Sequence, residues 1–321
     1  MASAAMPYPS MPAERDRWVM ARRAGFPRDP GLNPWKAGGW CVEAERSALG
    51  AMEAGLAVFL TNRECPWRCL MCDLWRHALA TTVPVGAIPA QIGGALREAG
   101  DTGALRWIKL YNAGSFFDRA AIPVADHGVI AGQCRPFDRV VVECHPSLVG
   151  PRVGAFRRIL RPGTRLEVAL GLETVHPGVL ERLNKRVTPD GFARAAAWLR
   201  ENDCDVRAFV LVKPPFMDAS MALEWAARSI DFAFGCGVDV VTLIPTRFGN
   251  GALEALGESG GFAPPSIAML EAAMVHGLGS GRGRVFADLW DLERFADGGI
   301  GHGVARERLE RMNRTQTVVA A

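Results

Sequence analysis

The chain has 321 residues and a net charge of +3, which is too small to argue for nucleic-acid binding by itself. Hydrophobic residues make up 49% and charged residues 22%, as is usual for globular proteins. No apolar run reaches the ~18 residues of a membrane span, and no basic-then-apolar secretion signal is visible. We therefore expect a cytoplasmic protein whose eight cysteines are reduced.

Residues 1–55 are rich in Pro, Gly and Trp, and we expect them to form a short N-terminal extension. Its first part is interpreted as a disordered or surface-draped arm, because small residues and prolines surround Glu14, Arg15 and Asp16. A short helical run is predicted at 43–52.

From residue 56 the sequence alternates between short apolar strings and helical strings. Near-continuous apolar strands separated by helices are typical of a parallel sheet built from βα units. A (β/α) barrel, complete or partial, and a doubly wound sheet both fit this pattern. The expected strands are 57–61, 107–111, 139–143, 166–170, 206–212 and 238–244, and the expected helices are 88–99, 189–202 and 219–234.

The pattern changes again after Pro245, where glycines become frequent. A helix at about 265–278 and a short apolar string at 284–288 follow. We interpret this part as a cap on the sheet and not as an independent domain. The predicted organisation is therefore an extension (1–55), a core (56–250) and a C-terminal cap (251–321).

Cysteines cluster in the loop that follows the first expected strand. Cys65, Cys69 and Cys72 have the spacing C-x3-C-x2-C. Thiolates are soft ligands that suit iron–sulfur clusters and zinc, and three on one loop can hold three corners of a cubane cluster. The loop also lies at the carboxyl end of a strand, where α/β sheets and barrels collect their sites. We therefore predict a cluster with one open iron.

Two alternatives remain open for this loop. His77 could complete a Cys3His zinc site, although zinc ligands more often come as two separated pairs. The cysteines could also be unligated. The other five cysteines are spread singly, which predicts no second cluster, and the role of Cys41, which precedes the first expected strand, is left undecided.

C-x3-C-x2-C after the first strand of a βα repeat resembles the radical S-adenosylmethionine (SAM) superfamily. The resemblance implies a partial (β/α)6 TIM-like barrel and a [4Fe–4S] cluster whose open iron binds SAM. It implies reductive cleavage of SAM to a 5′-deoxyadenosyl radical, which abstracts hydrogen from a substrate. It also implies an external low-potential electron donor, flavodoxin- or ferredoxin-like.

Two further stretches narrow the resemblance. Residues 171–174 (GLET) with 180–188 (LERLNKRVT) resemble the branch that contains the elongator catalytic subunit and the tRNA methylthiotransferases. The region around Cys65, with 109–118 (KLYNAGSFFD), is similar to the radical SAM subunit of archaeosine synthase.

The resemblance also implies residues that bind SAM at the ends of several strands. The turn after the second strand, with Asn112, Gly114 and Ser115, would bind the SAM amino group. The carboxylates of Glu143 and Glu173 would bind its ribose or ammonium, and Arg186 would pair with its carboxylate. Backbone groups near Ile244, at the end of the sixth strand, would bind adenine. Each position also has a plain structural interpretation, as a turn, a solvated charge or a packed core residue. The candidates are Asn112, Gly114, Ser115, Glu143, Glu173, Arg186 and Ile244.

The substrate is either a small metabolite or a modified nucleoside in tRNA. The modest charge and the absence of an obvious appended RNA-binding domain favour the small molecule. Two other functions remain as alternatives. One is a cluster enzyme that cleaves a different SAM bond to transfer an aminocarboxypropyl group, and the other is a non-catalytic zinc or iron–sulfur sensor.

Overall fold

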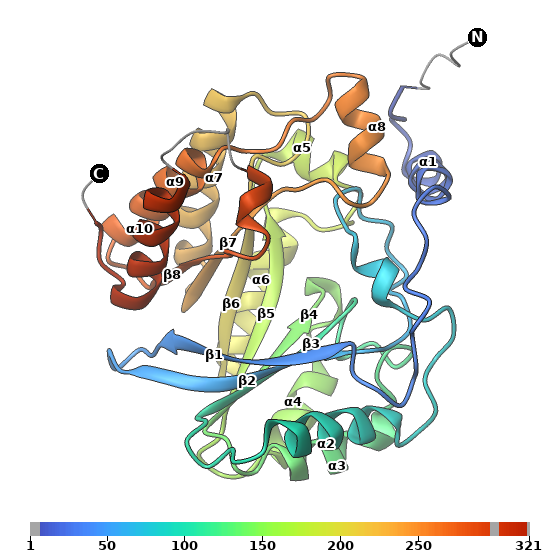
Figure 1. Ribbon diagram of the computed structural model, residues 1–321, viewed down its shortest axis with the longest axis vertical. Helices are drawn as coiled ribbons and strands as arrows, with labels where there is room; N and C mark the ends of the chain where they lie inside the picture. The colour runs from blue at the N-terminus through green and yellow to red at the C-terminus, as the bar shows by residue number, and fades with distance from the viewer. Residues whose placement is uncertain (1–6, 296–301, 320–321) are drawn as a thin grey trace.

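One eight-stranded sheet organises the computed structural model, which describes residues 7–295 and 302–319 (Figure 1). Its strands follow chain order across the sheet, and only the β1/β2 pair is antiparallel. They are β1 (Gly39–Arg46), β2 (Met52–Leu60), β3 (Trp107–Asn112), β4 (Arg139–Cys144), β5 (Arg165–Glu173), β6 (Cys204–Val212), β7 (Val240–Pro245) and β8 (Arg284–Ala287).

Helices connect the strands and cover the outer side of the curled sheet (Figure 1). The α-helices are α1 (Pro12–Arg23), α2 (Ala87–Ala99), α3 (His127–Gln133), α4 (Pro151–Ile159), α5 (Pro177–Arg182), α6 (Pro189–Glu201), α7 (Ala219–Gly235), α8 (Ala252–Glu258), α9 (Ile267–Gly279) and α10 (His302–Thr315). Short 3-10 helices are η1 (Leu74–His77), η2 (Val124–Asp126), η3 (Pro146–Leu148) and η4 (Leu292–Phe295). None of the helices within these two ranges is both long and apolar enough to cross a membrane.

The strand order decides between the two architectures that the sequence left open. A doubly wound sheet reverses its order at a switch point, whereas here each parallel strand adds to the same edge. Right-handed crossovers that all run in one direction put their helices on one face, and the sheet curls around the other. The predicted partial barrel is therefore confirmed.

Alternation along each strand separates the two faces of the sheet. In β3, Ile108 and Leu110 are fully buried in the apolar layer between the sheet and the helices. The intervening Lys109 contacts Glu43 and Glu45 on the inner side. Burial of the outer face, at about 25 cal/mol per Å² of apolar area, stabilises the half-barrel.

Three expectations about the chain's outer segments are wrong. Residues 43–52 are not helical, because Gly39–Arg46 forms β1 with Glu43 and Glu45 directed at Lys109. The sheet has eight strands and not six, since β1 and β8 lie outside the six that were expected. Residues 12–23 form the packed helix α1 and not a draped arm, with Trp18 and Val19 buried.

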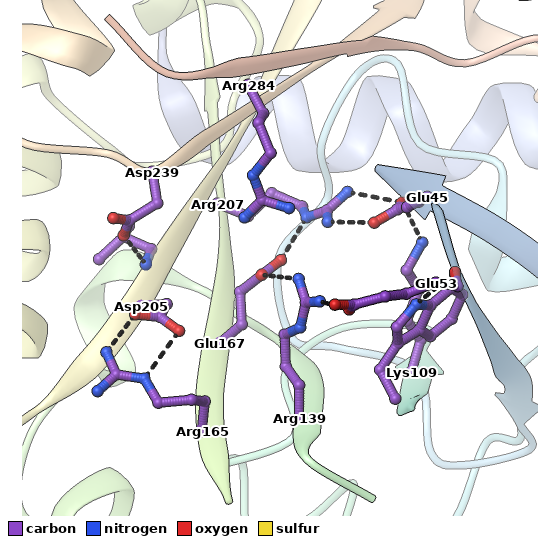
Figure 2. A network of polar contacts seen from close by, with 12 residues as sticks. Glu45, Glu53, Lys109, Arg139, Arg165, Glu167, Asp205, Arg207, Asp239 and Arg284 are labelled. Atoms are coloured by element: carbon purple, nitrogen blue, oxygen red, sulfur yellow. Dashed lines mark hydrogen bonds and ion pairs between the residues drawn. The ribbon is translucent and has the colours of Figure 1, made fainter. Parts of the chain in front are cut away.

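The inner face of the half-barrel carries a network of buried charges (Figure 2). Arg207 on β6 is 1% exposed and lies 2.6 Å from Glu167 on β5 and 2.8 Å from Glu45 on β1. Glu45 also pairs with Lys109, and Arg139 on β4 pairs with Glu53 at 2.7 Å. Such charges are tolerated inside a protein because each has an opposite partner. The network thereby joins β1 to β3 and β6, which are not its neighbours in the sheet.

The open edge at β8 is covered by amide side chains of α10 and the residue that follows it. The Ala287 N–H donates to Asn313 Oδ1 at 2.8 Å, and Asn313 Nδ2 donates back to the Ala287 carbonyl at 2.9 Å. Gln316 makes the same two bonds with the backbone of Val285, at 2.7 and 2.8 Å. Two side chains therefore occupy the positions that a ninth strand would take.

Candidate functional site

The cysteine loop lies between β2 and η1, at the carboxyl ends of the parallel strands. Cys69 is 8% exposed, Cys65 and Cys72 are half-buried, and all three thiols are free. Burial raises the pKa of each thiol, that of Cys69 to about 12. Within the described ranges, no three His, Cys, Asp or Glu side chains are arranged to hold a metal ion.

Two asparagines hold the backbone of this loop from later parts of the chain. Asn184 Nδ2 donates to the Arg68 carbonyl at 2.9 Å, and Asn250 Nδ2 donates to the Leu70 carbonyl at 2.7 Å. Both asparagines are buried. No local pattern in the sequence shows that a distant amide will satisfy a loop carbonyl, so these two residues could not be predicted.

The turn after β3 packs directly against the cysteine loop. Gly114 has φ +137°, and a Cβ atom at this position would lie 2.6 Å from Cys65 Cβ. Asn62 Oδ1 accepts a hydrogen bond of 3.1 Å from the Ala113 N–H, which ties the two segments together. The absence of a side chain at Gly114 is therefore what permits the close approach.

Asn112 and Ser115, on either side of Gly114, have different surroundings. Asn112 is 4% exposed, and neither its Oδ1 nor its Nδ2 has a hydrogen-bond partner in the described part of the chain. Ser115 is fully buried, with Oγ 3.5 Å from Cys144 Sγ and 3.4 Å from the His145 N–H. The Ser115 hydroxyl is thus engaged within the core, whereas the Asn112 amide is left for another partner.

Glu173 lies at a bulge in β5 and forms an ion pair that the sequence did not predict. Its φ of +65° and a register shift between Gly171 and Glu173 mark a break in the regular pairing. Glu173 Oε1 lies 2.5 Å from Lys185 Nζ. A Cβ at Gly171 would lie 2.1 Å from Lys185 Nζ, so glycine makes room for the pair. Burial would lower the pKa of Lys185, but Glu173 and nearby thiols raise it.

Arg186, the predicted partner for a SAM carboxylate, has a different environment from its neighbour Lys185. Its guanidinium lies 2.9 Å from Asp16 Oδ2 of α1, and 44% of its side chain is exposed. The structure thus brings Lys185, and not Arg186, to Glu173. Both residues lie in a loop without periodic pattern, so the sequence alone could not choose between them.

Glu143, the last residue but one of β4, lies near Asn112, Glu173 and Lys185. Its Oε2 accepts a 3.3 Å hydrogen bond from the Asn112 N–H. Burial raises the pKa of Glu143 to about 7, and the neighbouring Lys185 and Glu173 act on it in opposite directions. Asn112, Glu143, Glu173 and Lys185 therefore form one polar group at the carboxyl ends of β3, β4 and β5.

His145 supports the cysteine loop from β4's far end. Its ring stacks on Trp67 of the loop, with centroids 3.7 Å apart and planes 8° from parallel. Its Nε2 lies 2.9 Å from the Lys185 carbonyl, and its Nδ1 lies 2.7 Å from Ser147 Oγ. Burial lowers the pKa of His145 to about 4, so the ring is neutral at pH 7. Both ring nitrogens of His145 thus have hydrogen-bond partners.

Three other sequence candidates lie outside this polar group. Ile244 is a half-buried residue of β7 that packs against the apolar core and pairs with Leu211. Cys41 is half-buried in β1, opposite Ala57. His77 is largely exposed, and its Nδ1 lies 3.9 Å from Asp29.

Comparison with known proteins confirms the resemblance that the cysteine motif predicts, as a likeness of sequence and of fold. No family model matches the chain. Archaeosine synthase subunit beta of Methanosarcina acetivorans is 27% identical over 226 residues, which are 67% of this chain and 64% of that relative. The match therefore spans less than two thirds of the relative's length.

Solved structures of other proteins share the fold of this chain. Methylornithine synthase (PylB) superposes with a TM-score of 0.54 at 15% identity, covering 80% of this chain and 68% of that one. Elp3 of Methanocaldococcus infernus, with an N-terminal deletion, superposes with a TM-score of 0.51 at 13% identity, covering 69% and 58%. These likenesses show the half-barrel and say nothing further about the reaction.

Proposed function

We propose that this chain is a radical SAM enzyme in which Cys65, Cys69 and Cys72 hold a [4Fe–4S] cluster. The observation that carries the proposal is the contact between the cysteine loop and the Gly114 turn, beside a buried Asn112 amide that has no hydrogen-bond partner among residues 7–295 and 302–319. A cubane cluster binds each thiolate to a different iron, and three thiolates leave its fourth iron open. The three thiols on one loop therefore suit such a cluster by their donor atoms, their number and their spacing.

The polar group beside the loop suits the amino-acid end of SAM. Glu143 and Glu173 would accept hydrogen bonds from the ammonium or the ribose, and Asn112 offers both a donor and an acceptor. Lys185 would attract the SAM carboxylate, a role in which it replaces Arg186. Ser115 and Ile244 would contribute through backbone position. When bound, the cluster would supply the electron that cleaves SAM to methionine and a 5′-deoxyadenosyl radical.

The substrate is either a small metabolite or a nucleoside. The modest net charge of +3 favours a small molecule. The likeness to archaeosine synthase subunit beta favours a nucleoside and a second subunit instead. A gel shift with bulk tRNA that weakens steeply as salt rises would decide for the nucleoside.

Anaerobic reconstitution with iron and sulfide, followed by dithionite and SAM, tests the proposal directly. We expect the wild type to yield 5′-deoxyadenosine and the Cys69→Ala variant to yield none. Methylthioadenosine as the product would instead support aminocarboxypropyl transfer. Uptake of zinc without iron would support the sensor.

The proposed enzyme also needs an electron donor and a reducing compartment. An external flavodoxin- or ferredoxin-like donor would reduce the cluster, since such clusters need strongly reducing partners. A cytoplasmic location suits a chain whose eight cysteines are all free.

A further inference from the structure

Arginines from the N-terminal segment converge on the residue that precedes the first cysteine. Glu64 adjoins Cys65, and its side chain is 10% exposed. Arg23, at the end of α1, reaches Glu64 Oε1 at 2.7 Å, and Arg68 of the loop reaches the same oxygen at 3.1 Å. Arg28 pairs with the other oxygen, Oε2. One buried carboxylate thus binds three guanidinium groups.

The same arginines also reach the chain beyond the last cysteine. Arg28 Nη1 donates to the Trp75 carbonyl at 2.9 Å and to the Ala78 carbonyl at 2.5 Å. The Arg23 guanidinium lies 5.0 Å from the centroid of the Trp75 ring. Arg23 and Arg28 therefore join the segment before the cysteines to the segment after them.

Helix α1 is itself anchored to the middle of the loop. Trp18 and Val19 pack in a small apolar cluster with Leu70, which lies between Cys69 and Cys72, and with Leu253 of α8. Asp16 accepts a 2.7 Å hydrogen bond from Asn184 Nδ2, the amide that also binds the Arg68 carbonyl. Figure 1 shows α1 beside α8 at this end of the molecule. The loop is thus held at its entry, middle and exit by one segment.

We propose that residues 12–28 are a positioning clamp that restrains the backbone of the cysteine loop before metal binds, with Arg23 of this segment and Glu64 of the loop as its central pair. Arg23 acts through Glu64 and Trp75, and it is not itself a ligand. A network of one carboxylate and three guanidiniums is a costly way to gain stability, whereas it fixes the geometry of the chain that carries it. The nature of the metal centre rests on the proposed function, but the clamp does not.

The first test measures the loop without metal. Hydrogen exchange of the amides in residues 62–79 is compared in metal-free wild type, Arg23→Met and the control Arg17→Met, which changes an exposed residue of the same helix. We expect at least tenfold faster exchange in this segment for Arg23→Met and wild-type exchange for Arg17→Met. Unchanged exchange in Arg23→Met would overturn the proposal.

The second test measures retention of the metal centre. After anaerobic reconstitution, the rate of iron release to a chelator is expected to rise severalfold in Arg23→Met and in Glu64→Gln, and to recover partly in Arg23→Lys. Arg308→Met, which loses the pair between α10 and Glu271 of α9, is the control for general destabilisation. If the rate of iron release rises in proportion to the loss of thermal stability, and does so equally in Arg308→Met and Arg23→Met, the proposal is wrong. Helix α1 would then only stabilise the fold in general.

The two proposals fail in different ways. A wild type that binds no iron refutes the cluster and leaves the exchange experiment to judge the clamp. A wild type that binds iron, with unchanged exchange and iron release in Arg23→Met, refutes the clamp alone.

Discussion

Single residues decide how closely the segments of the candidate site approach one another. Gly114 lets the turn after β3 touch Cys65, and Gly171 leaves space for the Lys185 ammonium. In both places a glycine is needed because another group occupies the volume of a Cβ atom. Such positions are sensitive to the smallest substitution.

Gly114→Ala is expected to displace the cysteine loop. The added Cβ would lie 2.6 Å from Cys65 Cβ, and a φ of +137° is strained for alanine. We expect destabilisation of about 2 kcal/mol and loss of most reconstituted iron. Thermal unfolding and iron analysis measure both effects. Gly128→Ala, at a position with open space around the added Cβ, is the matched control and should retain its iron.

The buried pair of Glu173 and Lys185 leads to a second expectation. The two side chains are only 7% and 14% exposed, so removing one charge leaves the other without compensation. Glu173→Gln should lower the free energy of unfolding by about 3 kcal/mol, measured by denaturant titration. The double variant Glu173→Gln/Lys185→Met should recover part of this loss. A double variant less stable than the single one would contradict the pairing.

At the scale of elements, the attachment of β1 to the sheet depends on ion pairs, whereas most of the other strands are held by apolar contacts. Glu45 of β1 reaches Arg207 and Lys109 on the inner face of the sheet (Figure 2). Burial would raise the pKa of Glu45, but these two cations outweigh it and hold the pKa well below its usual range. The attachment of β1 is therefore linked to pH.

The direction of this linkage follows from the lowered pKa. Glu45 stabilises the fold fully above its unfolded pKa of about 4.3, and this contribution is lost as pH falls toward the folded pKa. We expect the denaturation midpoint to fall between about pH 5 and pH 3 in the wild type. Glu45→Gln should be less stable at pH 7 and should show a weaker dependence on pH. Parallel pH profiles for the two proteins would exclude Glu45 as the cause.

At the scale of the whole molecule, the exposed edge of an open sheet must be covered. Asn313 and Gln316 pair with the backbone of β8 through four hydrogen bonds. Asn313→Ala/Gln316→Ala should leave this edge free to pair with another chain. We expect oligomers in light scattering at concentrations where the wild type and the control Arg311→Ala stay monodisperse. A monodisperse double variant would show that the helix alone protects the edge.

The sequence predicted the half-barrel and the cysteine loop, because both depend on local patterns. The strands from β2 to β7 are mostly apolar strings that stand out between the helical segments. The strand β1 was missed since its pattern of Glu43, Ala44 and Glu45 is explained only by cations on distant strands. Asn250 was missed for the same reason, because its partner Leu70 is far away along the chain. Lys185 was missed because the loop that carries it has no periodic pattern.

The cover over β8 also has a consequence for synthesis. Because α10 follows β8 in the chain, translation must continue for roughly a few seconds after β8 has been made before the covering amides exist. Strand β8 therefore has free backbone groups until α10 has been made and has packed against the sheet. Two copies of the chain can pair through that strand only before this last step, so the risk of aggregation is greatest late in folding.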